Sequence, residues 1–136
     1  MAKALGIDYG TKRVGIAISD STQIIATALC ATQNIEIFKF LIDLTQKEEI
    51  DTIVVGEAKN LDGTATDSSV EIENFVEKIT ILFPKVKVTT IDERFTSKIA
   101  FQSIIDSGIK RKKRQNKSLI DEVSATIILQ DYLTYK

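Results

Sequence analysis

Apolar and polar residues alternate near the start of the chain with the period of two that is typical of β-strands. Residues 3–7 place large apolar side chains on one face and small residues, followed by Asp8, on the other. Residues 14–18 return as the second strand of a hairpin, and residues 24–28 predict a third strand. The first part of the chain therefore predicts three consecutive strands.

From residue 32 onward, helical spacing alternates with short apolar runs. Residues 51–55 form an apolar run rich in β-branched residues, typical of a buried parallel strand, and residues 86–91 predict a fifth strand. Capping and stop signals predict helices over 32–49, from Thr66 or Asp67 to before Pro84, from Thr96 or Ser97 to about Ser107, and from an N-cap at Ser118 onward.

The apolar stripe of each helix predicts the face that it buries. The stripe of the first helix consists of Ile35, Phe38, Leu41, Ile42 and Leu44. That of the second consists of Val70, Phe75, Val76, Ile79 and Leu82. That of the last consists of Leu119, Ile120, Val123, Ile127, Ile128 and Leu133.

Three meandering strands followed by alternating helices and strands predict an α/β fold. We expect one mixed five-stranded sheet with helices on both faces, which is the ribonuclease H-like layout, and a single domain over residues 1–136. If strands one, four and five are parallel, right-handed crossovers bring their carboxyl ends to one edge, where such sheets bind ligands. Asp8 and Glu93 would then share that edge.

Composition narrows the chemistry, because the 136 residues include no histidine. This excludes Ser-His-Asp and Cys-His catalysis and histidine-ligated metals, so hydrolysis must use carboxylates, which suit Mg²⁺ or Mn²⁺. The single cysteine, Cys30, rules out an internal disulfide and favours a cytoplasmic protein. A secretory leader and an apolar stretch long enough for a membrane are both missing, so we expect no membrane association.

The segment between the first two strands, Asp8-Tyr9-Gly10-Thr11-Lys12-Arg13, carries groups that suit a metal and a phosphate. Gly10 lets a phosphate approach the backbone, while Thr11, Lys12 and Arg13 supply a hydroxyl and two cationic donors. The alternative is that Asp8 and Gly10 only form a turn, since both residue types are common there.

Three carboxylates can hold two divalent ions that hydrolyse a phosphodiester. Asp8 and Glu93 are the first two candidates, although Asp92 competes with Glu93 because adjacent residues at a strand end point opposite ways. Asp121 is the third candidate, and its alternative role is to complement the positive end of the last helix dipole. Arg94 either contacts a phosphate or pairs with Asp92.

One third of the basic residues gather in one predicted loop, at Lys110, Arg111, Lys112, Lys113, Arg114 and Lys117. Such a loop suits a phosphate backbone, although charge runs are often only solvated. Aromatic residues are not interleaved with the cations, so we expect salt-sensitive backbone contact without sequence readout.

Four segments resemble the motifs of the YqgF/RuvX family, pre-16S rRNA nucleases also described as Holliday junction resolvase-like proteins, and the resemblance covers nearly the whole chain. The segments are residues 5–17 (LGIDYGTKRVGIA), 54–56 with 60–64 (VVG and NLDGT), 92–96 (DERFT), and Ile120-Asp121 with Ala125 and 127–130 (IILQ). The first motif is highly specific at its length. Each of the shorter motifs is weak evidence by itself, whereas the four motifs in order are strong evidence.

The resemblance implies that Asp8, Glu93 and Asp121 are the acidic triad of a ribonuclease H-like active site that needs Mg²⁺ or Mn²⁺. It favours the catalytic role for Asp121. It also implies trimming of the 5′ end of precursor 16S rRNA in the bacterial cytoplasm, with ribosomal particles as a further candidate partner. The chain departs from the family at Glu57-Ala58, where many members have Leu-Pro, which leaves the triad intact and the substrate detail open.

Other functions remain as alternatives at this stage. A Holliday junction resolvase-type DNA endonuclease would act as a dimer, whereas the sequence is compatible with a monomer or a weak homodimer. A nucleic-acid-binding ribosome-assembly factor without catalysis would bind independently of metal. A sugar-kinase or actin-like ATPase would use the same first loop, but such proteins need two domains of this kind and the chain has room for one.

Overall fold

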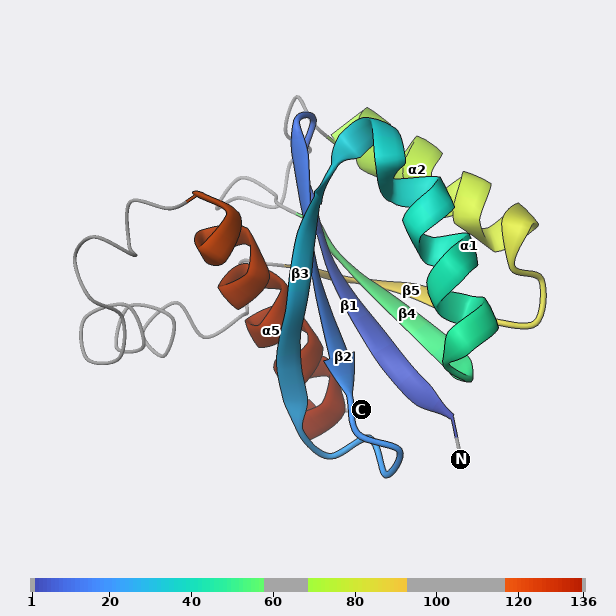
Figure 1. Cartoon of the computed structure of the whole chain (residues 1–136), viewed down its shortest axis with the longest axis vertical. Helices are drawn as coiled ribbons and strands as arrows, with labels where there is room; N and C mark the ends of the chain where they lie inside the picture. The colour runs from blue at the N-terminus through green and yellow to red at the C-terminus, as the bar shows by residue number, and fades with distance from the viewer. Residues whose placement is uncertain (1, 58–68, 93–116, 136) are drawn as a thin grey trace.

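The computed structural model describes residues 2–57, 69–92 and 117–135, which form a five-stranded sheet between two layers of helices (Figure 1). The elements are β1 (Lys3–Tyr9), β2 (Arg13–Ser19), β3 (Ala26–Gln33), the 3₁₀ turn η1 (Asn34–Glu36), α1 (Ile37–Lys47), β4 (Ile50–Glu57), α2 (Ser69–Leu82), β5 (Lys87–Asp92) and α5 (Lys117–Tyr135).

The strands lie in the order β3-β2-β1-β4-β5. β2 runs antiparallel to both β1 and β3, whereas β1, β4 and β5 are parallel to one another. In the register of these three strands, Ile7 lies beside Val55 and Val55 beside Thr90. The predicted mixed sheet is confirmed, and the carboxyl ends of β1, β4 and β5 form one edge, called the carboxyl edge below.

Two apolar cores lie on opposite faces of the sheet, as the prediction of helices on both faces required. α1 and α2 cover one face, while α5 runs across the other (Figure 1). The larger core includes Leu5, Ile7, Val14, Ile16, Ile37, Leu41, Ile53, Val55, Ile72, Phe75 and Ile79. The core under α5 consists of Ala4, Ala17, Val54, Ala125, Ile128, Leu129 and Leu133.

The prediction of a third strand at residues 24–28 was wrong in its bounds, because β3 covers Ala26–Gln33. The carboxylate of Asp20 accepts hydrogen bonds from the backbone N–H groups of Ile24 at 2.8 Å and Ile25 at 2.9 Å. Both isoleucines lie in the connection between β2 and β3, with more than half of their surface exposed. These local hydrogen bonds outweigh the β-propensity of the two side chains.

The predicted helix 32–49 was also wrong at its start. Thr32 and Gln33 continue β3 and pair with β2, and the 3₁₀ turn separates them from α1. The hydrophobic pattern could not show this boundary, since residues at the end of a strand can also fit the spacing of the helix that follows. The sheet ladder decides the boundary by supplying hydrogen-bond partners for the backbone of both residues.

Part of the predicted stripe is exposed in each of the first two helices. Ile35 precedes α1 and is 86% exposed, while Val70 in the first turn of α2 is 63% exposed. Ile37 and Ile72 take the buried positions instead, because they stand at three- or four-residue spacing from the residues that contact the sheet. The predicted positions that the structure confirms as buried are Leu41, Phe75 and Ile79, and in the last helix Ile128 and Leu133.

α5 begins at Lys117, so the predicted N-cap at Ser118 was wrong and Lys117 belongs to the helix rather than to the loop before it. Its buried face consists of Ala125, Ile128, Leu129 and Leu133. The predicted stripe residues Val123 and Ile127 are only half-buried. The helix therefore packs on the side that Asp121 shares with Ala125 in the helical repeat.

Candidate active-site edge

Asp8 lies near the C-terminal end of β1 and is half-buried. Its neighbours Ile7 and Tyr9 pack with the core under α1 and α2, and the Tyr9 ring stacks on Phe75 with the centroids 4.5 Å apart. Because side chains alternate along a strand, Asp8 belongs to the opposite face, which α5 covers. The predicted position of this carboxylate at the carboxyl edge is confirmed.

Gly6 lies two residues before Asp8 on the same face, at a close approach of β1 and α5. A Cβ built at Gly6 would lie 2.5 Å from Leu129 Cβ and 2.7 Å from the carbonyl oxygen of Ala125. No side chain larger than hydrogen fits at this separation without a displacement of the helix. The contact fixes the height of α5 above β1 close to Asp8.

Gln130 fixes the direction and position of α5. Its Oε1 accepts a hydrogen bond from the backbone N–H of Ala26 at 3.0 Å, and its Nε2 donates to the carbonyl oxygen of Ile24 at 3.0 Å. These groups lie at the start of β3, which is parallel to β1, so Gln130 is at the edge opposite the carboxyl edge. The N-terminal turn of α5 therefore points toward the carboxyl edge.

Asp121 stands one helical turn before Ala125, in the described backbone of α5. Starting from the contact between Gly6 and Ala125, Asp8 is about 6–7 Å farther along its strand, at roughly 3.3 Å per residue. Asp121 is about 6 Å farther along the helix in the same general direction, at 1.5 Å per residue. The backbone positions of the two predicted acids thus both lie on the carboxyl-edge side of this contact, although 112 residues separate them in sequence.

β4 and β5 also end at this edge with acidic residues. Asp92 is the last residue of β5, and its backbone lies beside that of Glu57, the last residue of β4. Glu93, the predicted second member of the triad, follows directly and lies outside the described residues. The predicted phosphate-binding residues Arg94, Lys110, Arg111, Lys112, Lys113 and Arg114 lie outside them as well, as does the predicted helix from Thr96 or Ser97 to about Ser107.

The turn between β1 and β2 is held by Asn34, which sequence reasoning missed. Asn34 Nδ2 donates a hydrogen bond to the carbonyl oxygen of Gly10 at 2.6 Å. The backbone N–H of Asn34 donates to the carbonyl oxygen of Lys12 at 2.9 Å. Gly10 is required there because a Cβ would collide with the carbonyl oxygen of Arg13. No sequence pattern pointed to Asn34, because it reaches Gly10 only through the pairing of β2 with β3.

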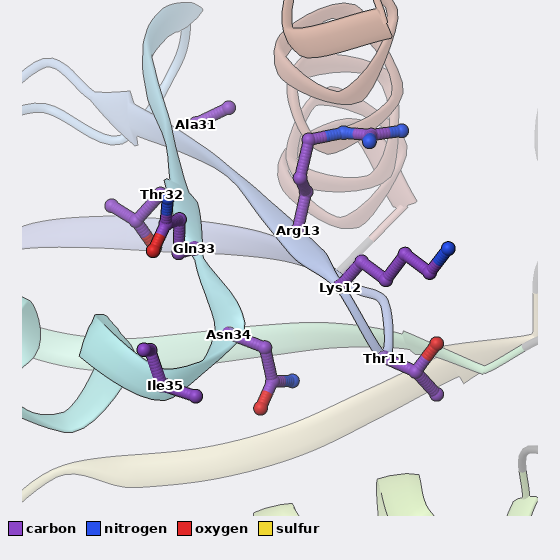
Figure 2. Close-up of a pocket in the computed structure, with 8 residues that line it drawn as sticks. All are labelled: Thr11, Lys12, Arg13, Ala31, Thr32, Gln33, Asn34 and Ile35. Carbon is purple, nitrogen blue, oxygen red and sulfur yellow. The ribbon is translucent and has the colours of Figure 1, made fainter.

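A groove of about 530 Å³ lies between this turn and the end of β3, lined by residues 11–13 on one side and 31–35 on the other (Figure 2). The close-up shows the long side chains of Lys12 and Arg13 both extending outward from the turn (Figure 2). Lys12 is exposed and Arg13 is half-buried. The structure thus brings these two predicted phosphate-binding residues together beside β1.

Residues 2–135 match a protein family model described as "RuvX: Holliday junction resolvase". The chain belongs to the RuvX family. Curated relatives over the whole chain carry the assigned name pre-16S rRNA nuclease: the protein of Flavobacterium psychrophilum is 51% identical and that of Flavobacterium johnsoniae 48% identical, each over 100% of this chain and 99% of the relative. The relative from Bacteroides thetaiotaomicron is 43% identical over the same shares of the two chains. The family assignment predicted from the four motifs is confirmed.

The RuvX chain also resembles solved structures of RuvC from Thermus thermophilus. The structure of that protein in complex with a Holliday junction substrate superposes with a TM-score of 0.61 and covers 98% of this chain and 94% of its own, at 13% identity. A second RuvC structure gives a TM-score of 0.57 at 10% identity. At these identities the likeness shows the fold, which confirms the predicted ribonuclease H-like architecture.

The donor chemistry of this edge fits a hard divalent cation, because the candidate ligands are carboxylates and the chain has no histidine. In the described part of the chain, no three acidic or cysteine side chains gather as a metal-binding group. Glu93 and the side chain of Asp121 are outside that part, so the predicted triad stays a prediction.

Among the described helices, none has the length and apolarity to span a membrane.

Proposed function

We propose that this RuvX protein is a divalent-metal-dependent nuclease that hydrolyses phosphodiester bonds, with the 5′ end of precursor 16S rRNA as its substrate. The observation that carries the proposal is the placement of Asp8 on the α5 face of the carboxyl edge, beside the first turn of the helix that bears Asp121. Relatives that are 41–51% identical over the whole chain and are named for this activity support the choice of substrate.

In the proposed mechanism Asp8, Glu93 and Asp121 would hold the metal ions, Mg²⁺ or Mn²⁺. Bound cations of this kind supply Lewis acidity to the attacking water and to the leaving oxygen of a phosphodiester. The water oxygen forms a bond to phosphorus as the bond to the 3′ oxygen breaks; the water gives up one proton to solvent and the 3′ oxygen takes one up, so the products carry a 5′-phosphate and a 3′-hydroxyl.

The cationic residues bind the phosphates of the substrate in this proposal. Lys12 and Arg13 extend from the turn after β1, close in sequence to Asp8, and their charges suit the phosphates beside the scissile bond. Arg94 and the basic residues 110–117 would bind the backbone farther away. Such contacts position the nucleic acid without reading its sequence, so binding should weaken as the salt concentration rises.

The proposal also places the protein in the bacterial cytoplasm, where precursor ribosomal RNA and ribosomal particles are its partners. We infer that it acts as a monomer or a weak homodimer, because trimming one strand end needs a single active site. A junction resolvase would instead cut two strands symmetrically as a dimer. The description of the matching family makes that activity the second candidate.

The deciding experiment incubates end-labelled precursor 16S rRNA and a four-way DNA junction with the protein in Mn²⁺, Mg²⁺ or EDTA. We expect cleavage of the RNA in either metal, none in EDTA, and none by Asp8→Asn or Asp121→Asn. Asp43→Asn is the matched control, since Asp43 is an exposed acid on α1, away from the carboxyl edge.

The outcomes of this experiment separate the candidate functions. Preferred cutting of the junction by a dimer would replace the RNA nuclease with a resolvase. Salt-sensitive binding of both nucleic acids without cutting in any metal would overturn catalysis and favour an assembly factor. Cleavage retained by Asp8→Asn would refute the role assigned to that carboxylate.

A further inference from the structure

The groove beside the carboxyl edge, lined by residues 11–13 and 31–35, has a chemistry that points to a ligand of its own (Figure 2). One wall carries the two cations, Lys12 and Arg13. The other wall consists of uncharged residues from the end of β3 and from η1, and ends in Ile35. The lining contains neither an acidic nor an aromatic residue, so it favours an anion and offers no ring on which a base could stack.

The groove is continuous with the face that bears Asp8. Asp8 lies opposite Gly15 in the pairing of β1 with β2, and Arg13 is two residues from Gly15 on the same strand. Strand alternation therefore puts Arg13 on the α5 side of the sheet, as it does Asp8. A strand of nucleic acid bound at the carboxyl edge can pass over Arg13 into the groove without crossing to the other face.

The walls of the groove are held in place before any ligand arrives. The backbone of Arg13 pairs with that of Gln33, and the hydrogen bonds of Asn34 to Gly10 and Lys12 join the two walls directly. A site fixed by backbone pairing loses little conformational freedom on binding, so more of the contact energy contributes to affinity. The arrangement is that of a preformed binding site.

We propose that this groove binds the sugar–phosphate backbone of the RNA strand that continues beyond the cleaved bond. Lys12 and Arg13 contact its phosphates, and the uncharged wall of residues 31–35 packs against its sugars. The proposal rests on the proposed nuclease function and adds a binding site for flanking nucleotides. Substrates that extend into the groove should bind more tightly than substrates that end at the cleaved bond.

The test introduces a charge at Ile35, whose side chain is 86% exposed and can be replaced without loss of packing. Ile35→Glu should weaken binding of a short fluorescein-labelled RNA by about fivefold, the factor for one like-charge contact at about 4 Å in water. Ile35→Lys should strengthen binding by a similar factor. Fluorescence anisotropy in EDTA measures both effects in the absence of cleavage.

Ile81 provides the matched control, because it is a 73% exposed isoleucine on α2, in the layer that covers the other face of the sheet. Ile81→Glu and Ile81→Lys change the net charge equally and should leave binding within twofold of the wild-type value. Thermal unfolding of all four variants checks that each remains folded. In the cleavage assay, Ile35→Glu should raise KM by the factor seen in binding.

Three results would overturn the proposal or separate it from the nuclease function. Equal changes of RNA affinity in the Ile35 and Ile81 variants would show that only net charge matters and would overturn the proposal that the groove binds RNA. Wild-type affinity and KM in both Ile35 variants would also overturn the groove as a binding site. Metal-dependent cleavage by the same variants would still support the nuclease function. Charge-dependent binding specific to Ile35, in a protein that cuts nothing, would support the groove and refute the nuclease.

Discussion

Gly6→Ala is the substitution that most directly tests how α5 and β1 form the site. A Cβ at residue 6 would meet Leu129 Cβ at 2.5 Å and the Ala125 carbonyl oxygen at 2.7 Å, with Leu129 Cα at 3.2 Å. These atoms belong to the helix backbone or are attached to it directly, so no rotamer change can relieve the clash. The helix must move away from the strand.

The size of the displacement follows from ordinary contact distances. Carbon atoms pack at about 3.5–4.0 Å, so α5 must shift by about 1 Å at Leu129. Overpacking of this kind costs about 1–3 kcal/mol of unfolding free energy. Because Asp121 is on the moving helix and Asp8 on the strand, the distance between the two acids changes as well, and a misplacement of about 1 Å in an active site can cost about 100-fold in rate.

Two assays measure these consequences separately. Urea unfolding followed by circular dichroism gives the loss of stability, and Mn²⁺-dependent RNA cleavage gives the loss of rate per folded molecule. Leu41→Ala is the control, because Leu41 is fully buried in the core on the opposite face. That variant should lose about 2–5 kcal/mol of stability and keep its cleavage rate while it is folded. If Gly6→Ala retained wild-type stability and rate, or if both variants lost rate equally, the reasoning would be refuted.

Two further predictions concern residues that support the same frame. Gln130→Ala removes both hydrogen bonds that join α5 to the start of β3 and should lower the unfolding free energy by about 1–3 kcal/mol, whereas Thr134→Ala should have little effect; equal losses in urea unfolding would contradict this role. Hydrogen bonds from the Thr22 hydroxyl and from the backbone N–H groups of Ile25 and Ile24 hold the pKa of Asp20 below its ordinary value. As the pH falls below about 4, Asp20 therefore takes up a proton in the unfolded chain before it does so in the folded protein. The unfolding free energy of the wild type should fall with pH in this range, and that of Asp20→Ala should fall less. Parallel curves of unfolding free energy against pH would contradict this prediction.

Much of the fold could be predicted because hydrophobic periodicity reports which face of an element is buried. The alternation in residues 3–7 correctly assigned Leu5 and Ile7 to one core and Ala4 to the other. The same alternation correctly placed Asp8 on the face of the small residues, which α5 covers in the structure. Periodicity is reliable at such positions because the burial of large side chains dominates the energetics there.

The boundaries of the elements could not be predicted in the same way. Ile24 and Ile25 have high β-propensity, yet the carboxylate of Asp20 holds their backbone in the connection between β2 and β3. Thr32 and Gln33 fit a helical pattern, yet pairing with β2 keeps them in the sheet. In both cases hydrogen bonds to specific partners, which the pattern does not reveal, outweigh local preference.

The sequence by itself determined the composition of the candidate site: carboxylates and cations without histidine, in motifs that identify the RuvX family. Only the tertiary structure decided how these groups are assembled. The close approach at Gly6 and the hydrogen bonds of Gln130 set the path of α5, which brings Asp121 to the carboxyl-edge side of the sheet, where Asp8 lies. Asn34 joins the turn after β1 to the end of β3 and so forms the adjoining groove. Side-chain chemistry is a property of single residues, whereas the distances that give it function depend on backbone packing between segments far apart in the chain.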